Sequence, residues 1–173
     1  MKLTAASEYG CLALLTIAEK DPDWCKRQEI CSRFEIPLTY LEQILRRLAV
    51  AGFIVSRRGA EGGFRLAKPA SKIAIAEVVR TMDGPIAPVT SVSERFYQPS
   101  PVEASPAFHA LFRQVRDVVA EILENTTLED IVEQEKLSRD RRRSGDRKRA
   151  VTAVRKPRAG ARSKRAAGSR KSS

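Results

Sequence analysis

The chain has 173 residues and carries 32 Lys and Arg against 21 Asp and Glu, a formal net charge of +11. A surplus of this size favours a polyanionic partner. The length allows one domain with an appendage and excludes a large multidomain enzyme. Because the sequence has no long apolar run and no secretion signal, we expect a cytoplasmic protein that does not bind membranes. Three cysteines cannot form a disulfide framework.

The positive charge is concentrated in the C-terminal part of the chain. Residues 1–135 contain 16 basic and 19 acidic residues, net −3, whereas residues 136–173 contain 16 basic and 2 acidic residues, net +14. The second segment has no aromatic and few apolar residues, so burial cannot offset the entropy lost on ordering it. We therefore predict a disordered Lys/Arg-rich tail over 136–173. Within the rest, residues 1–80 are net +4 and residues 81–135 are net −7.

Three helices are predicted before residue 52. Thr4 can cap a helix that runs to about Lys20, and a short helix follows over about 27–34. Thr39 and Glu42 have the spacing of a capping box and are expected to open the third helix. Gly52 is expected to end it.

The third helix has one apolar and one polar face. Its inward face is formed by residues spaced three and four apart, namely Leu41, Ile44, Leu45 and Leu48. The outward face then carries Tyr40, Gln43, Arg46 and Arg47. An amphipathic helix with this division presents amide and guanidinium groups to solvent.

A β-hairpin is predicted directly after these helices. Two β-prone segments, 53–56 and 64–66, are separated by the glycine-rich residues 57–63, which favour a tight reversal. A further helix is expected over about 75–82. Residues 84–106 contain five of the nine prolines and form an irregular connector.

A long helix is predicted from Ser105-Pro106, a good N-cap and first helical position, to about Glu124. Its apolar residues recur in steps of three and four, a pattern suited to packing against another helix. The predicted dimer interface consists of Phe108, Leu111, Phe112, Val115, Val118, Val119 and Ile122. Thr126 and Glu129 are expected to cap a last short helix that ends near residue 135.

Three helices followed by a hairpin are the elements of a winged helix-turn-helix, in which the third helix enters the major groove of double-stranded DNA. The predicted fold is mainly α with a small β-hairpin wing. Its parts are a DNA-binding domain over 1–83, an irregular connector over 84–106, a dimerisation helix with a short terminal helix over 107–135, and the tail over 136–173.

The candidate DNA contacts lie on the third helix and the hairpin. Amide and forked side chains read base edges, and an arginine beside a glycine can enter a narrow minor groove. We predict base or groove contacts from Thr39, Tyr40, Gln43, Arg47, Arg57, Arg58, Gly59 and Arg65. We predict phosphate contacts from Lys26, Arg27, Arg46 and Lys68. The alternative is that these arginines only solvate an exposed helix and turn.

Several segments have a characteristic sequence, notably the wing Ser56-Arg57-Arg58-Gly59-Ala60-Glu61-Gly62-Gly63-Phe64-Arg65-Leu66. The others are residues 1–4, Tyr9, and residues 39–48, 83–86, 108–112 and 126–131. Together they resemble the bacterial winged-helix repressors typified by the iron-sulfur cluster assembly regulator and the nitric-oxide-sensitive repressor, over about residues 1–135. The resemblance implies a homodimer on a near-palindromic operator, with Thr39, Tyr40, Glu42 and Gln43 near bases and Arg58 in the minor groove.

The chain departs from that family in its connector. Sensor members hold an iron-sulfur cluster with three connector cysteines, whereas residues 84–107 contain none, so we expect no metal and no cofactor. His109 matches a ligand position, but a single imidazole cannot hold such a cluster. Glu35 occupies a turn position where the family commonly has Gly, which costs about 1 kcal/mol if φ is positive.

Cys25 is the candidate redox thiol. It precedes a helix N-terminus and neighbours Lys26 and Arg27, all of which favour the thiolate. Oxidation there would distort the helix and release DNA. The alternative is an inert small residue beneath the helix.

The expected function is that of a sequence-specific transcriptional regulator, a repressor without an iron-sulfur cluster. The chain contains no catalytic or nucleotide-binding signature, so we do not expect an enzyme. One alternative is a sequence-nonspecific nucleic-acid packing protein driven by the tail, and another is a winged domain that binds only proteins. The packing protein predicts steep salt dependence and no sequence preference.

Overall fold

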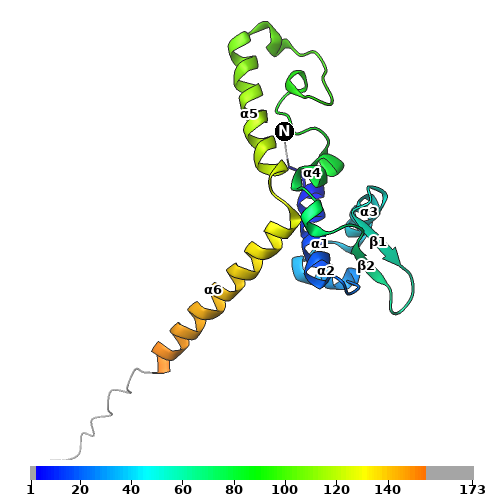
Figure 1. Ribbon diagram of the computed structural model, residues 1–173, viewed down its shortest axis with the longest axis vertical. Coiled ribbons are helices and arrows are strands. Elements are labelled where there is room, and N and C mark those ends of the chain that lie inside the picture. Colours follow the sequence, from blue (N-terminus) through cyan, green and yellow to red (C-terminus); the bar gives the residue numbers. More distant parts are fainter. Residues whose placement is uncertain (1–2, 155–173) are drawn as a thin grey trace, which may run out of the picture. The chain divides into compact units, whose positions relative to one another are not determined.

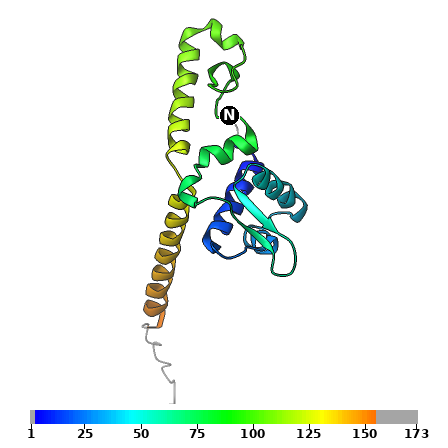
Figure 2. The same ribbon diagram turned by 45° about the vertical axis from the view of Figure 1, so that its right-hand side comes forward.

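The computed structural model describes residues 3–154, with side chains over residues 3–142. The helices and strands are α1 Ala5–Lys20, α2 Arg27–Phe34, α3 Leu38–Val50, β1 Ile54–Arg57, β2 Gly63–Leu66, α4 Ile75–Asp83, α5 Pro106–Glu124 and α6 Leu128–Val154 (Figures 1 and 2). This order confirms the predicted mainly α fold with a hairpin wing. Within the described range, no helix is long and apolar enough to cross a membrane.

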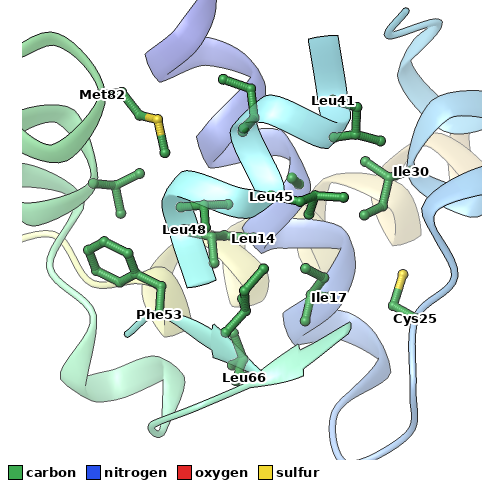
Figure 3. Packing of buried hydrophobic residues seen from close by; sticks show 14 of the residues in the cluster. Leu14, Ile17, Cys25, Ile30, Leu41, Leu45, Leu48, Phe53, Leu66 and Met82 are labelled. Carbon is green, nitrogen blue, oxygen red and sulfur yellow. The ribbon is translucent and has the colours of Figure 1, made fainter. Parts of the chain in front are cut away.

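Three helices and the hairpin enclose the main hydrophobic core (Figure 3). The predicted inward face of α3 is confirmed, because Leu41, Ile44, Leu45 and Leu48 are all buried. They meet Leu14 and Ile17 of α1, which are fully buried. Each such side chain contributes about 1.5–3 kcal/mol on leaving water. The core therefore fixes α3 with its opposite face outward.

The start of α1 confirms the predicted cap. The Thr4 hydroxyl accepts a hydrogen bond from the backbone N–H of Ala6 at 3.2 Å. The Thr4 N–H donates to Asp83 Oδ2 at 2.8 Å, and the Thr4 hydroxyl donates to the same carboxylate. The beginning of α1 is thereby joined to the end of α4.

The capping box predicted for α3 is wrong. The helix begins at Leu38 after Pro37, and Thr39 lies inside the first turn without a capping hydrogen bond. Glu42 instead pairs with Arg27 of α2 at 2.6 Å. An ion pair between neighbouring helices has replaced the local bond that the spacing suggested.

The box predicted for the last helix is displaced by one residue. Asp130 N–H donates to the Thr127 hydroxyl at 3.2 Å, and Thr127 N–H donates to the Asp130 carboxylate at 2.8 Å. Thr126 cannot cap this helix because its hydroxyl donates to Ile122 O at 2.7 Å, at the end of α5. The pair Thr127 and Asp130 therefore replaces Thr126 and Glu129.

The hairpin is extended by a segment from far upstream. Its strands pair antiparallel with Ile54 opposite Leu66 and Arg57 opposite Gly63. The backbone of Cys25 adds a bridge, in which its N–H donates to Phe64 O at 2.9 Å and its carbonyl oxygen accepts from Phe64 N–H at 2.8 Å. A Cβ at Gly63 would lie 2.5 Å from Cys25 O. Glycine is therefore required at the crossing of the two backbones.

Helix α4 contributes to two apolar clusters. Val78 and Met82 belong to the main core, whereas Ala76 and Val79 form a second cluster with Ile86. Val119, Ala120 and Leu123 of α5 pack against that second cluster. Helix α4 therefore connects the wing domain to α5.

The chain returns to the main core after α5. Ile75 N–H donates to Thr126 O at 2.9 Å, and Leu128 N–H donates to Ile73 O at 2.8 Å. The side chain of Leu128 is buried in the main core. The end of α5 is therefore attached to the start of α4 by backbone hydrogen bonds.

Helix α6 does not end near residue 135 as expected. It continues to Val154, so the segment predicted to be disordered is helical in its first part. Arg, Lys, Glu and Ala are strong helix formers, and no proline occurs between residues 128 and 156. The rest of the predicted tail, residues 155–173, lies outside the described residues. The first compact unit of the chain ends at Lys136.

Candidate nucleic-acid interface

Three polar side chains on the outward face of α3 are free. Thr39, Gln43 and Arg46 are exposed, and none has a hydrogen bond or ion pair with another described residue. The apolar residues on the opposite face hold α3 in the core. These three groups are therefore available to a ligand without breaking an internal contact.

Two other residues of α3 that were predicted to contact DNA interact with side chains of this chain. Tyr40 is half-buried and meets the ring of Tyr9 edge to face, with centroids 5.5 Å apart. The Glu42 carboxylate is held by Arg27. That pair neutralises a negative charge that would otherwise repel a phosphate backbone.

Arg47 is directed toward α4. Its Nη2 donates to Thr81 O at 2.6 Å and to Met82 O at 2.7 Å. These carbonyls belong to the last turn of α4, where backbone acceptors lack helical partners and a positive charge is favoured. Arg47 thus links the third helix to α4 in this structure and does not lie beside Arg46 as a free side chain.

The wing is organised by Trp24. Arg57 and Arg65 lie over its ring at 5.0 Å and 5.1 Å from the centroid. Both project from the same face of the hairpin. Arg65 lies opposite Val55, and Arg57 is two residues after Val55 on the same strand, where alternate side chains share a face. Cation–π contacts of this kind hold the guanidinium groups in place. The sequence offered no signal for Trp24, since its partners are far downstream.

The tip of the wing carries the free arginine. Arg58 is exposed and has no hydrogen bond, ion pair or ring contact with another described residue, and Gly59 has a positive φ of 103° that suits glycine. The loop between the strands projects beyond the helices in both views (Figures 1 and 2).

A basic groove separates the wing from the start of α2. Four of its lining residues are cationic, namely Lys26, Arg27, Arg57 and Arg58. Lys68, also predicted to contact phosphate, is outside this groove and pairs with Glu77 at 2.9 Å. The groove places positive charge between the start of α2 and the wing, where an anionic strand would be attracted.

The turn between α2 and α3 has the strain anticipated for Glu35. Its φ is 53° and its ψ is 33°, in the left-handed region. The positive φ expected at this position is confirmed, and glycine would adopt it at a lower conformational free energy than Glu35 does. The turn sets the angle between the two helices on which the interface is built.

The predicted environment of Cys25 is wrong. The side chain is fully buried, and burial, reinforced by the charge of Glu29, raises the pKa of its thiol to about 11. The effect of burial outweighs the charges of Lys20 and Arg33, which act to lower the pKa. Burial also raises the pKa of the half-buried Cys11 thiol to about 11. A redox role for Cys25 stays a prediction, with a protonated buried thiol as its starting state.

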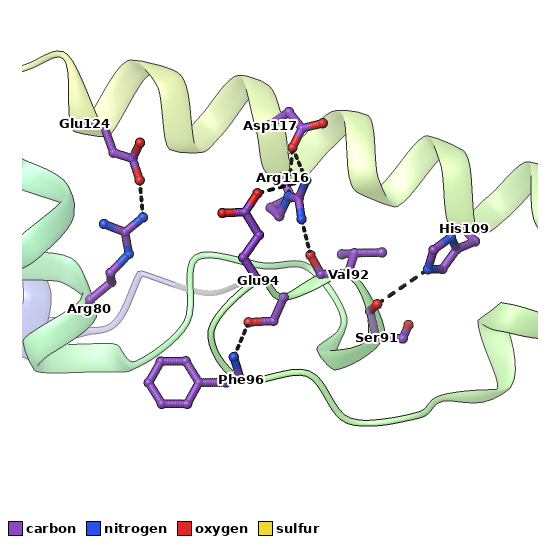
Figure 4. A network of polar contacts seen from close by, with 10 residues as sticks. Arg80, Ser91, Val92, Glu94, Phe96, His109, Arg116, Asp117 and Glu124 are labelled. Carbon is purple, nitrogen blue, oxygen red and sulfur yellow. Dashed lines mark hydrogen bonds and ion pairs between the residues drawn. The ribbon is translucent and has the colours of Figure 1, made fainter.

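The connector is attached to α5 by polar side chains (Figure 4). Arg116, whose side chain is only 14% exposed, donates to Val92 O at 2.7 Å and pairs with Glu94 at 3.4 Å. His109 Nε2 lies 3.4 Å from Ser91 O. Since the histidine contacts the connector backbone, its position has a structural explanation.

The same region does not fit an iron-sulfur cluster. Such clusters need thiolates, and no cysteine lies between Gly84 and Ala107. Among the side chains that the structure describes, no three His, Cys, Asp or Glu residues form a group that could hold a metal ion. The donor set of this chain therefore does not match the cofactor of the sensor proteins.

The predicted dimerisation stripe is largely exposed. No residue of α5 is buried, and Phe108, Leu111, Val115, Val118 and Ile122 are all exposed apolar side chains. Phe112 is half-buried and stacks on Phe108 with centroids 6.3 Å apart. Val119 differs from the expectation, because it packs against α4 within the same chain.

Comparisons with known proteins agree with this architecture. The sequence profile of the Rrf2 family, described as iron-dependent transcriptional regulators, matches residues 3–134. A helix-turn-helix transcriptional regulator of rrf2-like type from Rhodobacter capsulatus is 34% identical over 137 residues, covering 75% of this chain and 91% of that protein. CymR of Bacillus subtilis is 31% identical over 132 residues, covering 76% of this chain and 89% of CymR.

Solved structures give the same result. The structure of CymR, the global cysteine regulator of B. subtilis, matches with a TM-score of 0.63 at 30% identity, covering 78% of this chain and 98% of that one. The T. potens IscR structure shares the fold with a TM-score of 0.62 at 24% identity, covering 78% and 88% of the two chains. The resemblance identified from the sequence is thus confirmed, and the relatives named are transcriptional regulators, not enzymes. The chain belongs to the Rrf2 family of winged helix-turn-helix transcriptional regulators.

Proposed function

We propose that the protein is a sequence-specific repressor that binds a near-palindromic operator as a homodimer, without an iron-sulfur cluster. One observation carries the proposal: Thr39, Gln43 and Arg46 are free on the outward face of α3, in a domain whose wing presents a free Arg58. Free polar groups on a rigid helix are the arrangement that base reading requires.

In this proposal α3 enters the major groove. The Gln43 amide can donate to and accept from one base edge, and Thr39 and Arg46 reach neighbouring bases or phosphates. The basic groove follows the phosphate backbone beside the α2 N-terminus. Arg58 enters the minor groove, while Arg57 and Arg65 keep the wing rigid through their contacts with Trp24.

The exposed stripe of α5 supports the homodimer. Large apolar side chains gathered on one helix face are unusual on a monomer surface. A two-fold interface would bury the stripe of each protomer against the other. Two α3 helices would then reach successive major grooves about 34–36 Å apart.

Substitutions at two free arginines test the DNA-binding surface. The operator is first obtained by selecting genome fragments with the purified protein. Arg58→Ala is then expected to weaken operator binding about tenfold or more, by about 1–3 kcal/mol. Arg95→Ala is the matched control, because Arg95 is also exposed and unpaired among the described residues but lies in the connector. Equal effects of both changes would contradict the proposed surface.

A charge placed on the stripe tests the dimer. Val115→Asp is expected to give monomers in sedimentation experiments, because burying an unpaired carboxylate is costly. Gln114→Asp introduces the same charge at an exposed position beside it and should leave the dimer intact. A Val115→Asp protein that sediments as a dimer would show that α5 is not the interface.

Anaerobic purification tests the proposal that no cluster is used. The family description names iron, but the connector lacks thiolates. The protein is expected to be colourless and to bind its operator equally well after treatment with an iron chelator. A brown preparation whose operator binding is lost on chelation would overturn this part of the proposal.

A further inference from the structure

The extension beyond the family match is strongly basic. The Rrf2 profile ends at residue 134, whereas α6 continues to Val154. Residues 136–154 contain eight basic and two acidic residues, and residues 155–173 add eight basic and no acidic residues. The proposed function of the winged domain does not account for this segment.

The composition of the extension excludes two common uses of a helix. Leu137, Val151 and Val154 are the only large apolar residues between 136 and 154, too few to form a continuous apolar stripe that could pack against a protein core. An interfacial membrane helix also needs an apolar face beside its charges. Lys136, Arg141 and Arg142, whose side chains are described, are exposed. The remaining explanation is electrostatic attraction to a polyanion.

We infer that residues 136–154 bind the DNA backbone without reading its sequence. This rests on the proposed function for its partner, since the winged domain brings the same DNA to the chain. Residues 81–135 carry a net charge of −7, which opposes approach to DNA, and the extension more than offsets it with +14. Covalent linkage gives the extension a high effective concentration near any duplex that α3 has bound.

The inference predicts a particular salt dependence. Each phosphate neutralised releases counterions and contributes about −0.9 to the slope of log affinity against log salt. If about three of six substituted charges engage phosphates, the slope changes by about 2.7, or about fortyfold in relative affinity between 50 and 200 mM salt. The effect applies equally to every sequence.

Two full-length variants isolate the charge of the extension. In the first, Arg141, Arg142, Arg143, Arg147, Lys148 and Arg149 are all changed to Gln, which keeps helix propensity and removes charge. The control changes the same five arginines to Lys and retains every charge. Fluorescence anisotropy with a random-sequence duplex and with the selected operator is measured across a salt series.

The Gln variant is expected to lose affinity for both duplexes by the same factor, at least about tenfold in low salt, with a shallower salt slope. The Lys control should bind like the parent, and the ratio of operator to random affinity should be unchanged in both. Failure of the proposed function would give a different result. The parent protein itself would then bind the operator and the random duplex with nearly equal affinity.

Three results would overturn the inference. The first is unchanged DNA binding by the Gln variant, and the second is a loss confined to the operator. The third is a parent that binds phosphatidylserine-containing vesicles through these residues while its DNA affinity does not depend on them. If the Gln variant bound neither duplex, and the parent did not prefer the operator to the random duplex, the packing protein would be favoured over the regulator.

Discussion

The winged domain and α5 differ in how far they bury their apolar side chains. Leu41 of α3 is 0% exposed, whereas Leu111 of α5 is 49% exposed. The same residue type therefore has an internal partner in one region and none in the other. The winged domain buries its apolar residues in the main core, while α5 has one face on α4 and one face directed to solvent.

The difference indicates which properties depend on protein concentration. Burial inside one chain stabilises the fold at any concentration, whereas burial between chains does so only when they associate. Substitutions in the two regions should therefore respond differently to dilution.

The largest expected effect comes from the same substitution made in each region. Leu41→Ala should lower the free energy of unfolding by about 3 kcal/mol, because it leaves a cavity in a closed core. Leu111→Ala should cost under about 1 kcal/mol in dilute protein and more at high concentration, where the dimer forms. Urea unfolding at two protein concentrations measures both. Equal losses that do not change with concentration would remove the distinction.

The next effect separates two adjacent arginines of α3. Arg47→Met should lower stability by about 1.5–3 kcal/mol, because Thr81 O and Met82 O lose charge-assisted hydrogen bonds. Arg46→Met should stay within about 0.5 kcal/mol of the parent and should instead weaken DNA binding. Thermal unfolding and operator titration distinguish the two. The reverse assignment would mean that Arg47 leaves α4 to bind DNA.

A smaller effect, of opposite sign, is expected at Glu35. Glu35→Gly should stabilise the protein by about 0.5–1 kcal/mol, since glycine adopts a positive φ without the penalty of a Cβ. Glu35→Ala is the control, because it removes the carboxylate and keeps the Cβ. If both variants gained stability, charge and not backbone strain would be the cause.

The smallest effect is a pH dependence at the contact between α1 and α4. Burial acts to raise the pKa of Asp83, but hydrogen bonds, including those from Thr4, outweigh it and hold the pKa below its ordinary value of 3.8. Because the folded-state pKa is lowered, this stabilisation is complete above pH 3.8 and is lost as the pH falls through the folded-state value. Asp83→Asn should flatten acid unfolding curves in that range. A parallel curve would show that Asp83 contributes nothing.

Local patterns were sufficient for most of the helices. The bounds of α2 and the buried face of α3 agree with spacing alone, since each depends on residues within two turns. The hairpin also agrees, because its glycines are close in sequence. The capping boxes failed where a competing partner existed, Arg27 for Glu42 and Ile122 O for Thr126.

Contacts between distant segments could not be predicted from spacing. Cys25 is buried by a bridge to Phe64, and Arg47 is held by Thr81 and Met82, all more than thirty residues downstream. The contacts of Trp24 with Arg57 and Arg65 of the wing are likewise between segments more than thirty residues apart. Among the candidate DNA contacts, the chemistry was readable from residue type, but which side chains were free depended on these long-range contacts.

The backbone hydrogen bonds between residues 73–75 and 126–128 have a consequence for the operator. They attach the exit of α5 to the same segment from which α4 begins, and α4 also packs on α5. In the proposed dimer this linkage would hold the two α3 helices at a nearly fixed separation and angle. Inserting one base pair between half-sites rotates one relative to the other by about 34°, a helical turn being about 10–10.5 bp, so we expect the operator to tolerate base changes in its centre better than changes in its length.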